Sequence, residues 1–326
     1  MKYQSPKLFV GPVSKNTVDA VIEYANEYNV NLGLIPSRRQ VDWNGGYVNG
    51  WNTESFVKYV KSKTNLVVLQ RDHGGPGQGK EKDDGEKSFL VDNEFMDLIH
   101  IDPWKTDMSS DDCIRETIYW LNRLDNPNVM FEIGTEQAIR PLTVEEVDHM
   151  IHRIHKSVPT RVWLKIFYLV VQSGTALLEN KQIGKYNERN LIEFVKSAKF
   201  HLFYTKEHNG DYLPTKDIKH KFDFGLDSIN LAPEFGMIET NCFLKEIKHT
   251  DPKLIHVLYK MCYESNTWTK WVDKHFDVKN EERLIKICCH YLFSTPEFEK
   301  KILRNLRNID VDVKSKMKER IHEIVN

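Results

Sequence analysis

The chain has 326 residues, of which 40% are hydrophobic and 11% aromatic, enough for one large core or two smaller ones. Its 46 lysines and arginines are balanced by 47 aspartates and glutamates, so no basic excess favours nucleic acid or an anionic membrane as a partner. The five cysteines show no disulfide or CxxC spacing, and no segment is apolar enough to span a membrane. Residues 1–7 lack the apolar core of a signal peptide, so we expect a cytoplasmic protein.

Short apolar runs typical of buried strands alternate with helical patterns as far as residue 250. The predicted strands are residues 8–10, 32–35, 66–69, 98–101, 129–133, 162–171, 200–204 and 228–231. Helical patterns between them include residues 17–28, 53–62, 110–124 and 143–155. About eight strands alternating with helices predict a parallel (β/α)₈ TIM barrel over residues 1–250.

The pattern changes after residue 250, where helical periodicity continues and strand signals stop. Helices are predicted at residues 253–265, 281–293, 296–308 and 313–325. We therefore expect residues 251–326 to form a helical C-terminal extension, which either packs on the barrel or mediates oligomer formation.

The stretch from Arg71 to Gln78 combines an acid, an imidazole and chain-breaking residues directly after the third predicted strand. Asp72 and His73 are adjacent, so in a regular strand their side chains would point in opposite directions. A turn at this point would bring both to the mouth of the barrel, where such folds carry their chemistry. The same stretch continues into G-x-x-x-x-G-K, but Glu81 stands where a nucleotide P-loop needs Ser or Thr, so we reject a nucleotide site.

Polar residues also follow the other predicted strands, and in a barrel these loops meet on one face. The motifs in chain order are Gln40-Val41-(x)₃-Gly45-Gly46-Tyr47, Asp72-His73-Gly74-Gly75-Pro76, Ile99-His100-Ile101-Asp102, Ile133-Gly134-Thr135-Glu136, Val170-Val171-Gln172-Ser173-Gly174 and Glu207-His208-Asn209-Gly210-Asp211-Tyr212. Together they resemble the accessory, non-catalytic subunit family of class II tagatose-1,6-bisphosphate aldolase. That family is related to the zinc-dependent class II aldolases, which are (β/α)₈ barrels.

The resemblance implies roles for individual residues. Asp72 would act as the acid/base at the hydroxyl next to the bond that breaks, and His73 would bind the metal. His208 matches a second metal-binding histidine, and Glu136 stands where aldolase carboxylates approach the metal and would share in catalysis. Asn230 resembles a substrate-binding asparagine. The chain departs from the aldolases at Gln172, where they supply a further metal-binding histidine.

The predicted metal site is therefore a set of two histidines and one carboxylate, His73, His208 and Glu136. Such a set suits a divalent ion, with Zn²⁺ expected first and Mn²⁺ or Fe²⁺ as alternatives. His100 lies inside an apolar strand and is predicted to be a core histidine. His149, His152 and His155 lie on a predicted outer helix and are expected to be solvated.

A phosphorylated sugar would need backbone N–H groups in glycine loops and a cation to hold its phosphate. Arg38 or Arg39 is the candidate cation. The other predicted substrate-binding residues are Gln40, Gln172, Gly174, Thr175, Asn209, Gly210, Asp211 and Asn230.

Three functions are compatible with these residues. The first is a metal-dependent aldolase-like lyase, or a related enzyme that forms an enediolate, acting on a ketose phosphate. The second is an accessory subunit that stabilises a separate catalytic tagatose-bisphosphate aldolase. The third is a sugar-phosphate isomerase or epimerase. The expected partner is a phosphorylated sugar, and a catalytic aldolase subunit or further copies of the chain are alternatives for a protein partner. No nucleic acid and no membrane are expected.

Overall fold

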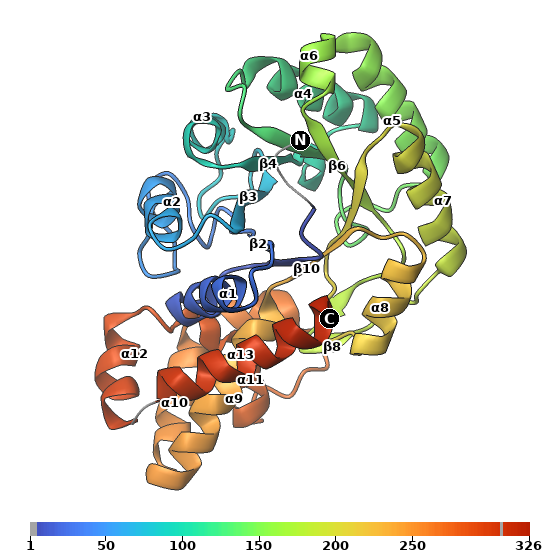
Figure 1. Cartoon of the computed structure of the whole chain (residues 1–326). Helices are drawn as coiled ribbons and strands as arrows, with labels where there is room; N and C mark the ends of the chain where they lie inside the picture. The colour runs from blue at the N-terminus through green and yellow to red at the C-terminus, as the bar shows by residue number, and fades with distance from the viewer. Residues whose placement is uncertain (1–4, 307–308) are drawn as a thin grey trace.

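Eight parallel strands close into a barrel in the computed structural model, which describes residues 5–306 and 309–326 (Figure 1). Going round the barrel, the strands follow the order β1-β10-β9-β6-β5-β4-β3-β2, and each neighbouring pair is parallel. The predicted (β/α)₈ TIM barrel is confirmed. Among the described residues, the helices are too short or too polar to cross a membrane.

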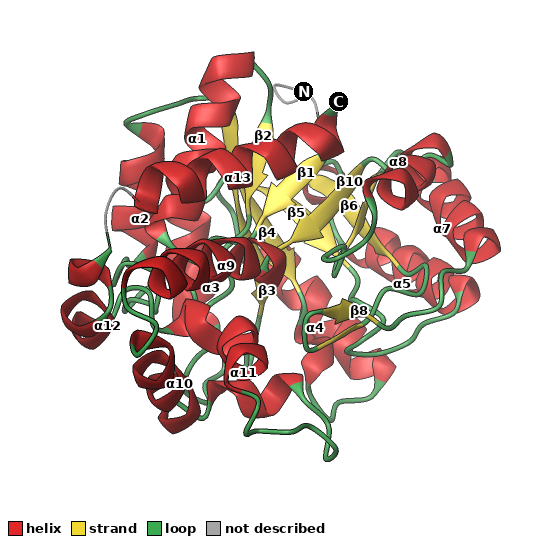
Figure 2. Cartoon of the chain, turned by 90° about the horizontal axis from the view of Figure 1, so that it is seen from below, coloured by secondary structure: helices red, strands yellow, loops and turns green. Residues whose placement is uncertain are grey.

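The strands are short, and most of them are followed by a helix on the outside of the barrel (Figures 1 and 2). The barrel strands are β1 Leu8–Val10, β2 Leu32–Leu34, β3 Val67–Gly74, β4 Leu98–Ile101, β5 Met130–Ile133, β6 Ile166–Val171, β9 Tyr204–Glu207 and β10 Ser228–Leu231. A small hairpin after β6 consists of β7 Leu177–Leu178 and β8 Lys181–Gln182.

The helices that belong to the barrel alternation begin mostly at residues whose side chains cap the first turn, such as Ser14, Asn52 and Thr143. They are α1 Lys15–Tyr28, α2 Thr53–Lys61, α3 Glu86–Phe95, α4 Ser110–Arg123, α5 Val144–Ser157, α6 Thr160–Trp163, α7 Glu188–Phe200, α8 Thr215–Asp223 and α9 Pro233–Thr250, with a 3₁₀ turn η1 at Pro103–Lys105.

The C-terminal extension contains helices and no strand among its described residues, as expected. The helices are α10 Leu254–Glu264, η2 Thr267–Trp271, α11 Glu281–Cys288, η3 Cys289–Tyr291, α12 Pro296–Lys301, η4 Leu303–Asn305 and α13 Ile309–Val325. Two residues of the helix predicted over 296–308, numbers 307 and 308, lie outside the described residues, as do residues 1–4 of the N-terminal segment. We propose residue 250, where α9 ends, as the boundary between barrel and extension.

Two strand predictions were displaced. Residues 160–163 form the short helix α6, so the sixth barrel strand starts only at Ile166. Helix α7 runs to Phe200, and the seventh barrel strand is Tyr204–Glu207 instead of 200–204. In the sequence, the adjacent charged residues Lys206 and Glu207 are typical of a loop and not of a buried strand. Both side chains are nevertheless buried, because each pairs with an opposite charge, at Glu132 and Lys221 respectively.

The barrel interior has an apolar lower layer and a polar upper layer. The apolar layer is a separate buried cluster of Phe9, Ile35, Val68, Leu98, Phe167 and Tyr168. The polar layer contains Gln70, His100, Glu132 and Lys206, and all four are fully buried. A polar layer this deep has to satisfy its own hydrogen bonds, because water cannot do so.

The loop after β2 is held against β3 by a fully buried guanidinium. Arg71 pairs with Asp92 on α3 at 2.7 Å and donates to the carbonyl oxygens of Pro36 and Val41. Burial opposes the charge on Arg71, but the Asp92 carboxylate raises the pKa of the guanidinium. The ion pair therefore connects β3, α3 and the β2 loop.

We expect Arg71→Met to lower the free energy of unfolding by about 3–5 kcal/mol, because Asp92 would remain buried without its partner. Urea denaturation monitored by circular dichroism measures this change. The double variant Arg71→Met/Asp92→Asn should recover part of the loss, since it leaves no uncompensated charge. A double variant as unstable as the single one would contradict this explanation.

The extension packs on the outside of the barrel at the seam between its first and last strands. Helix α13 lies along α1 and α9 (Figure 1). Arg320 on α13 pairs with Glu234 of α9 at 2.7 Å, and Tyr24 of α1 hydrogen-bonds to His322 of α13 at 3.0 Å. The last helix therefore joins the two ends of the barrel.

Near this seam α9 carries a buried carboxyl group, Glu239, which is 1% exposed. Its oxygens accept hydrogen bonds from the Ser14 hydroxyl at 2.5 Å and from the Asn16 amide at 2.9 Å. Burial raises the pKa of Glu239 to about 7, although these two hydrogen bonds oppose the shift.

The raised pKa makes stability depend on pH. Between about pH 4.5 and 7 the folded chain keeps the Glu239 proton that the unfolded chain loses, so stability falls as pH rises through this window. We expect Glu239→Gln to remove this slope and to stabilise the protein at pH 8 by about 2–3 kcal/mol. Urea titrations at pH 5 and pH 8 give the free energy of unfolding of the parent and of the variant. If that free energy changes equally with pH in both proteins, the explanation is contradicted.

Candidate metal centre

The backbone turns at His73, so the side chains of Asp72 and His73 reach the same site. His73 has φ 44°, in the left-handed region, and the pairing of β3 with β4 shifts between Arg71 and Gly74. The turn expected from the sequence is therefore present. One polar atom of Asp72 and one of His73 belong to a single cluster of possible metal ligands.

Three histidines meet at this site, and each is held by a hydrogen bond from one ring nitrogen. His73 Nδ1 lies 2.5 Å from Asp102 Oδ2, and His208 Nε2 lies 2.7 Å from Glu132 Oε1. His100 Nε2 donates to the carbonyl oxygen of Gly134 at 2.9 Å. These acceptors favour the tautomers in which the opposite nitrogen is free to bind a metal.

The free nitrogens converge. His73 Nε2 lies 3.3 Å from His208 Nδ1, and the ring of His100 lies 5.1 Å and 5.0 Å from those of His73 and His208. His100 Nδ1 is buried and has no hydrogen-bond partner among the described residues. A convergent set of unprotonated nitrogens is what a bound divalent ion requires.

Two carboxylates border the same point. Asp72 Oδ1 lies 3.6 Å from His73 Nε2 and 3.6 Å from His208 Nδ1, and it is buried without a hydrogen bond within the described chain. Glu136 Oε2 lies 3.4 Å from His73 Nε2 and 3.8 Å from His208 Nδ1. The Asn209 amide orients Glu136 by donating to the same oxygen at 2.8 Å.

The residues present fit a divalent metal. Asp72, His73, His100 and His208 each offer one ligand atom, and these atoms all lie within 4.8 Å of one another. Two of them, Asp72 Oδ1 and His100 Nδ1, are buried polar atoms without a partner, which is costly unless something else satisfies them. An ion bound here would satisfy both.

His100 differs from its prediction. It is fully buried in a strand, as expected of a core histidine, but its Nδ1 faces the cluster. The sequence held a usable signal, because side chains alternate along a strand and Asp102, directly after β4, is two residues from His100. With His100, the cluster has three histidines, although Gln172 stands where the resemblance implies a further one. Glu136 lies beside the four clustered residues.

Neighbouring charges and burial shift the pKa values of the side chains around the site. Burial opposes charge on His73, but Asp72 and Glu136 outweigh it and raise the pKa of the ring well above its usual value. Burial likewise works against the Glu132 carboxylate, yet the Lys206 ammonium and His100 hold its pKa well below the usual range. Burial alone is the largest influence on His100 and lowers its pKa.

The Glu132 carboxylate is shared between the metal centre and the barrel core. One oxygen accepts from His208 as described above, and the other lies 2.6 Å from Lys206 Nζ. Gln70 bonds to both Glu132 and Lys206, and the Lys206 ammonium lies 3.7 Å from the centre of the Phe9 ring. Glu132 and Lys206 had no role in the sequence prediction.

Arg38 and the two predicted glutamines are engaged by the protein itself. The Arg38 guanidinium pairs with Asp42 at 3.0 Å and with Asp83 at 2.5 Å, and it donates to Gly75. Gln40 accepts from the backbone of Ser37. Gln172 accepts from Leu142 and donates to Thr135 and Arg140.

The loops after β6 and β9 support the site through their backbones. The Thr175 hydroxyl donates to the carbonyl of His208 at 2.9 Å, and Gly210 donates to that of Asn230. Gly174 has φ 99° and leaves no room for a side chain against Lys185. Asp211 accepts from Ala232 and Glu234 at the start of α9, and burial raises its pKa to about 8.

Asn230 stands apart from these supporting residues. It is 7% exposed, and neither its amide nitrogen nor its carbonyl oxygen has a partner among the described residues. Of the predicted substrate-binding side chains, it is therefore the one with both polar groups free.

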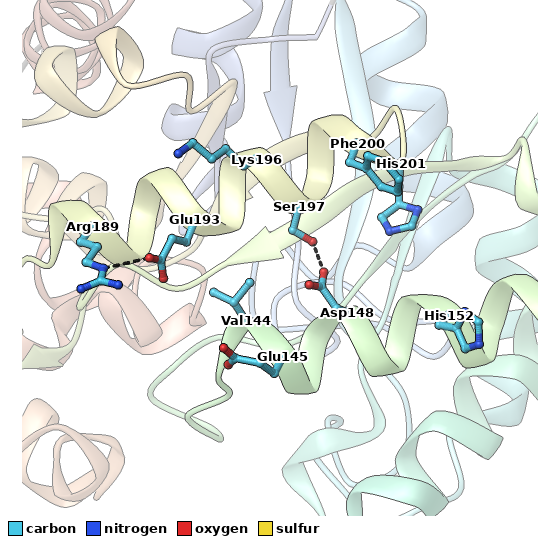
Figure 3. Close-up of a pocket in the computed structure, with 10 residues that line it drawn as sticks. All are labelled: Val144, Glu145, Asp148, His152, Arg189, Glu193, Lys196, Ser197, Phe200 and His201. Carbon is cyan, nitrogen blue, oxygen red and sulfur yellow. Dashed lines mark hydrogen bonds and ion pairs between the residues drawn. The ribbon is translucent and has the colours of Figure 1, made fainter.

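A separate hollow of the surface lies away from this site. A groove of about 710 Å³ runs between the outer helices α5 and α7 and is lined by side chains such as Asp148, His152, Arg189 and Phe200 (Figure 3). The ion pair between Arg189 and Glu193 in this groove joins residues four apart on α7, as is usual on a solvated helix surface. No strand end contributes to this groove, so we do not place the chemistry there.

Comparisons with known proteins identify the class of fold. No family model matches the chain, and no curated protein matches it significantly. A probable tagatose 6 phosphate kinase of Sinorhizobium meliloti 1021 is similar in structure, with a TM-score of 0.76 and 13% identity over 98% of this chain and 99% of that one.

Two further solved structures are similar in fold to this chain. The fructuronate-tagaturonate epimerase of Cohnella laeviribosi has a TM-score of 0.70 and 12% identity over 98% of this chain and 80% of that one. A fructose-bisphosphate aldolase of Campylobacter jejuni has a TM-score of 0.60 and 16% identity over 98% and 89%. At these identities the likeness shows the fold alone, which is a TIM barrel.

We expect the purified protein to bind about one Zn²⁺ per chain after dialysis against the metal, as in other three-histidine sites. His73→Ala, His100→Ala and His208→Ala should each abolish stoichiometric binding, measured by plasma mass spectrometry. Glu132→Gln should weaken zinc binding by about 10–100-fold, because it loosens the partner that orients His208.

The control is His152→Ala on the outer helix α5, which should bind zinc normally. Circular dichroism shows whether each variant is folded. Unchanged zinc content in all three histidine variants would contradict the site.

Proposed function

We propose that the chain is a metal-dependent enzyme that forms an enediolate from a ketose phosphate, and that it cleaves a carbon–carbon bond as an aldolase-like lyase. The observation that carries the proposal is the convergence of three oriented histidine nitrogens with two carboxylates at the barrel mouth. The proposal places the protein in cytoplasmic carbohydrate metabolism, the setting expected from its sequence.

His73, His100 and His208 would hold the ion, with Asp72 or Glu136 beside it. Zn²⁺ is our first choice for this nitrogen-rich set, and Mn²⁺ or Fe²⁺ would also suit it. When bound, a divalent ion polarises the ketone and stabilises the negative charge of the enediolate.

Asp72 is positioned to move the proton. Its Oδ1 faces the proposed ion, which leaves Oδ2 of the same carboxylate to accept the proton of the hydroxyl next to the bond that breaks. The electron pair of that bond then enters the enediolate, and the former hydroxyl carbon leaves as an aldehyde. Glu136, held by Asn209, is available to return a proton to the enediolate carbon.

Asn230 would bind a substrate oxygen. A carboxamide offers one acceptor and two donors, and at this position both ends are free. It would therefore hold a hydroxyl or carbonyl group of the sugar in place without moving a proton itself.

A sugar-phosphate isomerase or epimerase is the second candidate. The presence of two carboxylates at one centre favours it, because one can remove a proton and the other can return it. The likeness in fold to the fructuronate-tagaturonate epimerase adds support for this candidate.

The role of accessory subunit for a tagatose-bisphosphate aldolase rests on the resemblance of the loop motifs. It requires no metal and no free carboxylate, so the unpartnered Asp72 and His100 atoms support an enzyme over an accessory subunit. In this alternative a catalytic aldolase subunit, or further copies of the chain, would bind the protein.

Deuterium exchange tests the chemistry common to the two enzymes. In D₂O with zinc, the protein should place deuterium on a carbon next to the carbonyl of dihydroxyacetone phosphate or a ketose phosphate, as seen by proton NMR. Asp72→Asn and Glu136→Gln should slow the reaction by about 10²–10⁴-fold while zinc content is kept.

The products separate the candidates. Two smaller carbonyl compounds from one ketose bisphosphate indicate a lyase, whereas one rearranged sugar indicates an isomerase or epimerase. Zinc-loaded protein that neither exchanges deuterium nor converts any ketose phosphate, and that raises the thermal stability of a tagatose-bisphosphate aldolase on mixing, would overturn the enzyme in favour of the accessory role.

A further inference from the structure

The C-terminal extension holds the β7–β8 hairpin at its turn. Glu179 lies in this turn with φ 54°, a left-handed conformation that is uncommon for a residue with a side chain. Its carboxylate accepts two hydrogen bonds from Arg283 of α11, at 2.7 and 2.6 Å, and its backbone N–H donates to the carbonyl of Trp271 in η2 at 2.7 Å. These contacts offset the cost of the conformation. The turn is therefore fixed by the extension, where α11 lies near the hairpin (Figure 2).

The second strand of the hairpin is bonded to the loop after β9. Gln182 of β8 donates from Nε2 to the carbonyl oxygens of Asn209 at 2.8 Å and of Asp211 at 3.1 Å. Its Oε1 accepts from the backbone N–H of Ala176 at 2.6 Å, so both ends of the carboxamide are in use. The hairpin therefore fixes the backbone of residues 209–211.

The base of the hairpin leaves it little freedom to deform. The backbone N–H of Ile183 donates to the carbonyl of Ala176 at 2.8 Å. A side chain at Gly184 would clash with the carbonyl oxygen of Gly174, so the two backbones are in direct contact. We therefore expect a displacement of the turn to move Gln182 as well.

Asn209 connects the hairpin to the metal centre. Its φ of 57° turns the chain directly after His208, and its side-chain amide donates to Glu136 Oε2 at 2.8 Å. The same oxygen lies 3.4 Å from His73 Nε2. The direction of a side chain depends on the conformation of its backbone. Without the bond from Gln182, the Asn209 amide would therefore lose its fixed place beside Glu136.

The far side of the same loop is also held by the extension. Arg320 of α13 donates to the carbonyl of Leu213 at 2.8 Å and pairs with Glu234 at 2.7 Å. The Glu234 carboxylate accepts from the backbone N–H of Tyr212 at 2.8 Å. The extension thus holds the loop after β9 at two places, and the hairpin is the one that bonds to Asn209 itself.

We propose that the C-terminal extension positions Glu136 through this hairpin, with Arg283 and Gln182 as positioning residues that do not touch the substrate. The contacts run from Arg283 to Glu179, along the hairpin to Gln182, and through Asn209 to Glu136. The use of Glu136 to move a proton rests on the proposed function, whereas its orientation by Asn209 does not. Such a series of contacts couples two sites only if a change at one end alters the other.

A nuclear magnetic resonance measurement on the full chain tests the coupling without substrate. In protein labelled with ¹⁵N-asparagine and with zinc present, the signal of the Asn209 side-chain amide is assigned from its loss in Asn209→Ser. Gln182→Glu keeps the shape of the side chain but removes the donor to Asn209, and Arg283→Gln releases the turn. We expect each to shift this signal and to speed the exchange of its hydrogens with water by about 5–10-fold, because a hydrogen bond is weakened.

Arg304→Gln is the matched control, because Arg304 also belongs to the extension but pairs within it, with Glu299 at 3.7 Å. Its Asn209 signal should match that of the parent. Arg283→Lys keeps the positive charge and should restore most of the parent signal. Circular dichroism shows whether each variant is folded. An Asn209 signal that is unchanged in both test variants would overturn the proposal.

The rate of deuterium exchange separates positioning from a general loosening of the fold. We expect Gln182→Glu and Arg283→Gln each to lower kcat by about tenfold and to leave KM within about twofold, because neither residue binds substrate. Combined with Glu136→Gln, either change should slow the reaction no further, since both act through Glu136. Effects that add fully to that of Glu136→Gln would contradict the positioning role.

The two measurements distinguish this proposal from the proposed function. If the Asn209 signal responds in the variants but the zinc-loaded parent exchanges no deuterium, the coupling stands and the proposed enzyme is overturned. If the parent exchanges deuterium and the Asn209 signal does not respond, the coupling is overturned and the proposed function stands.

Discussion

A single buried carboxylate, Glu132, connects the barrel core to the histidine cluster above it. One oxygen faces Lys206 and the other faces His208, so the carboxylate can satisfy both only in one orientation. Burying an unpaired charge is far more costly than burying a matched pair. The core therefore cannot rearrange without also turning His208, and the geometry of the site depends on the packing beneath it.

Much of the barrel could be predicted because its strands are short, apolar and evenly spaced, and because the loops that follow them carry the polar residues. The seventh strand was placed too early for a physical reason. A pattern of hydrophobicity assigns the charged residues Lys206 and Glu207 to a loop. The partners that allow them to be buried are distant in sequence, so the pattern does not include them. Only the closed barrel brings Glu132 and Lys221 to them.

In the site too, residues with informative sequence neighbours could be predicted, and residues that depend on distant parts of the chain could not. The pair Asp72-His73 could be found because it interrupts a strand and is followed by glycines. His100 is predicted to be a core histidine because its neighbours in sequence are apolar, while the side chains that cluster with it lie on β3 and directly after β9. Arg38 and Arg39 are adjacent and chemically identical, and only the positions of Asp42 and Asp83 separate a structural arginine from a free one.

The position of α13 has a consequence for the order of events during synthesis. This helix begins at Ile309 and packs against α1, near the start of the chain, where His322 meets Tyr24. A ribosome releases α1 long before α13, so α1 must wait for all the strands and helices between them before its partner emerges. The seam of the barrel is thus sealed late in synthesis, and a nascent chain without α13 would expose the apolar face of α1 to chaperones.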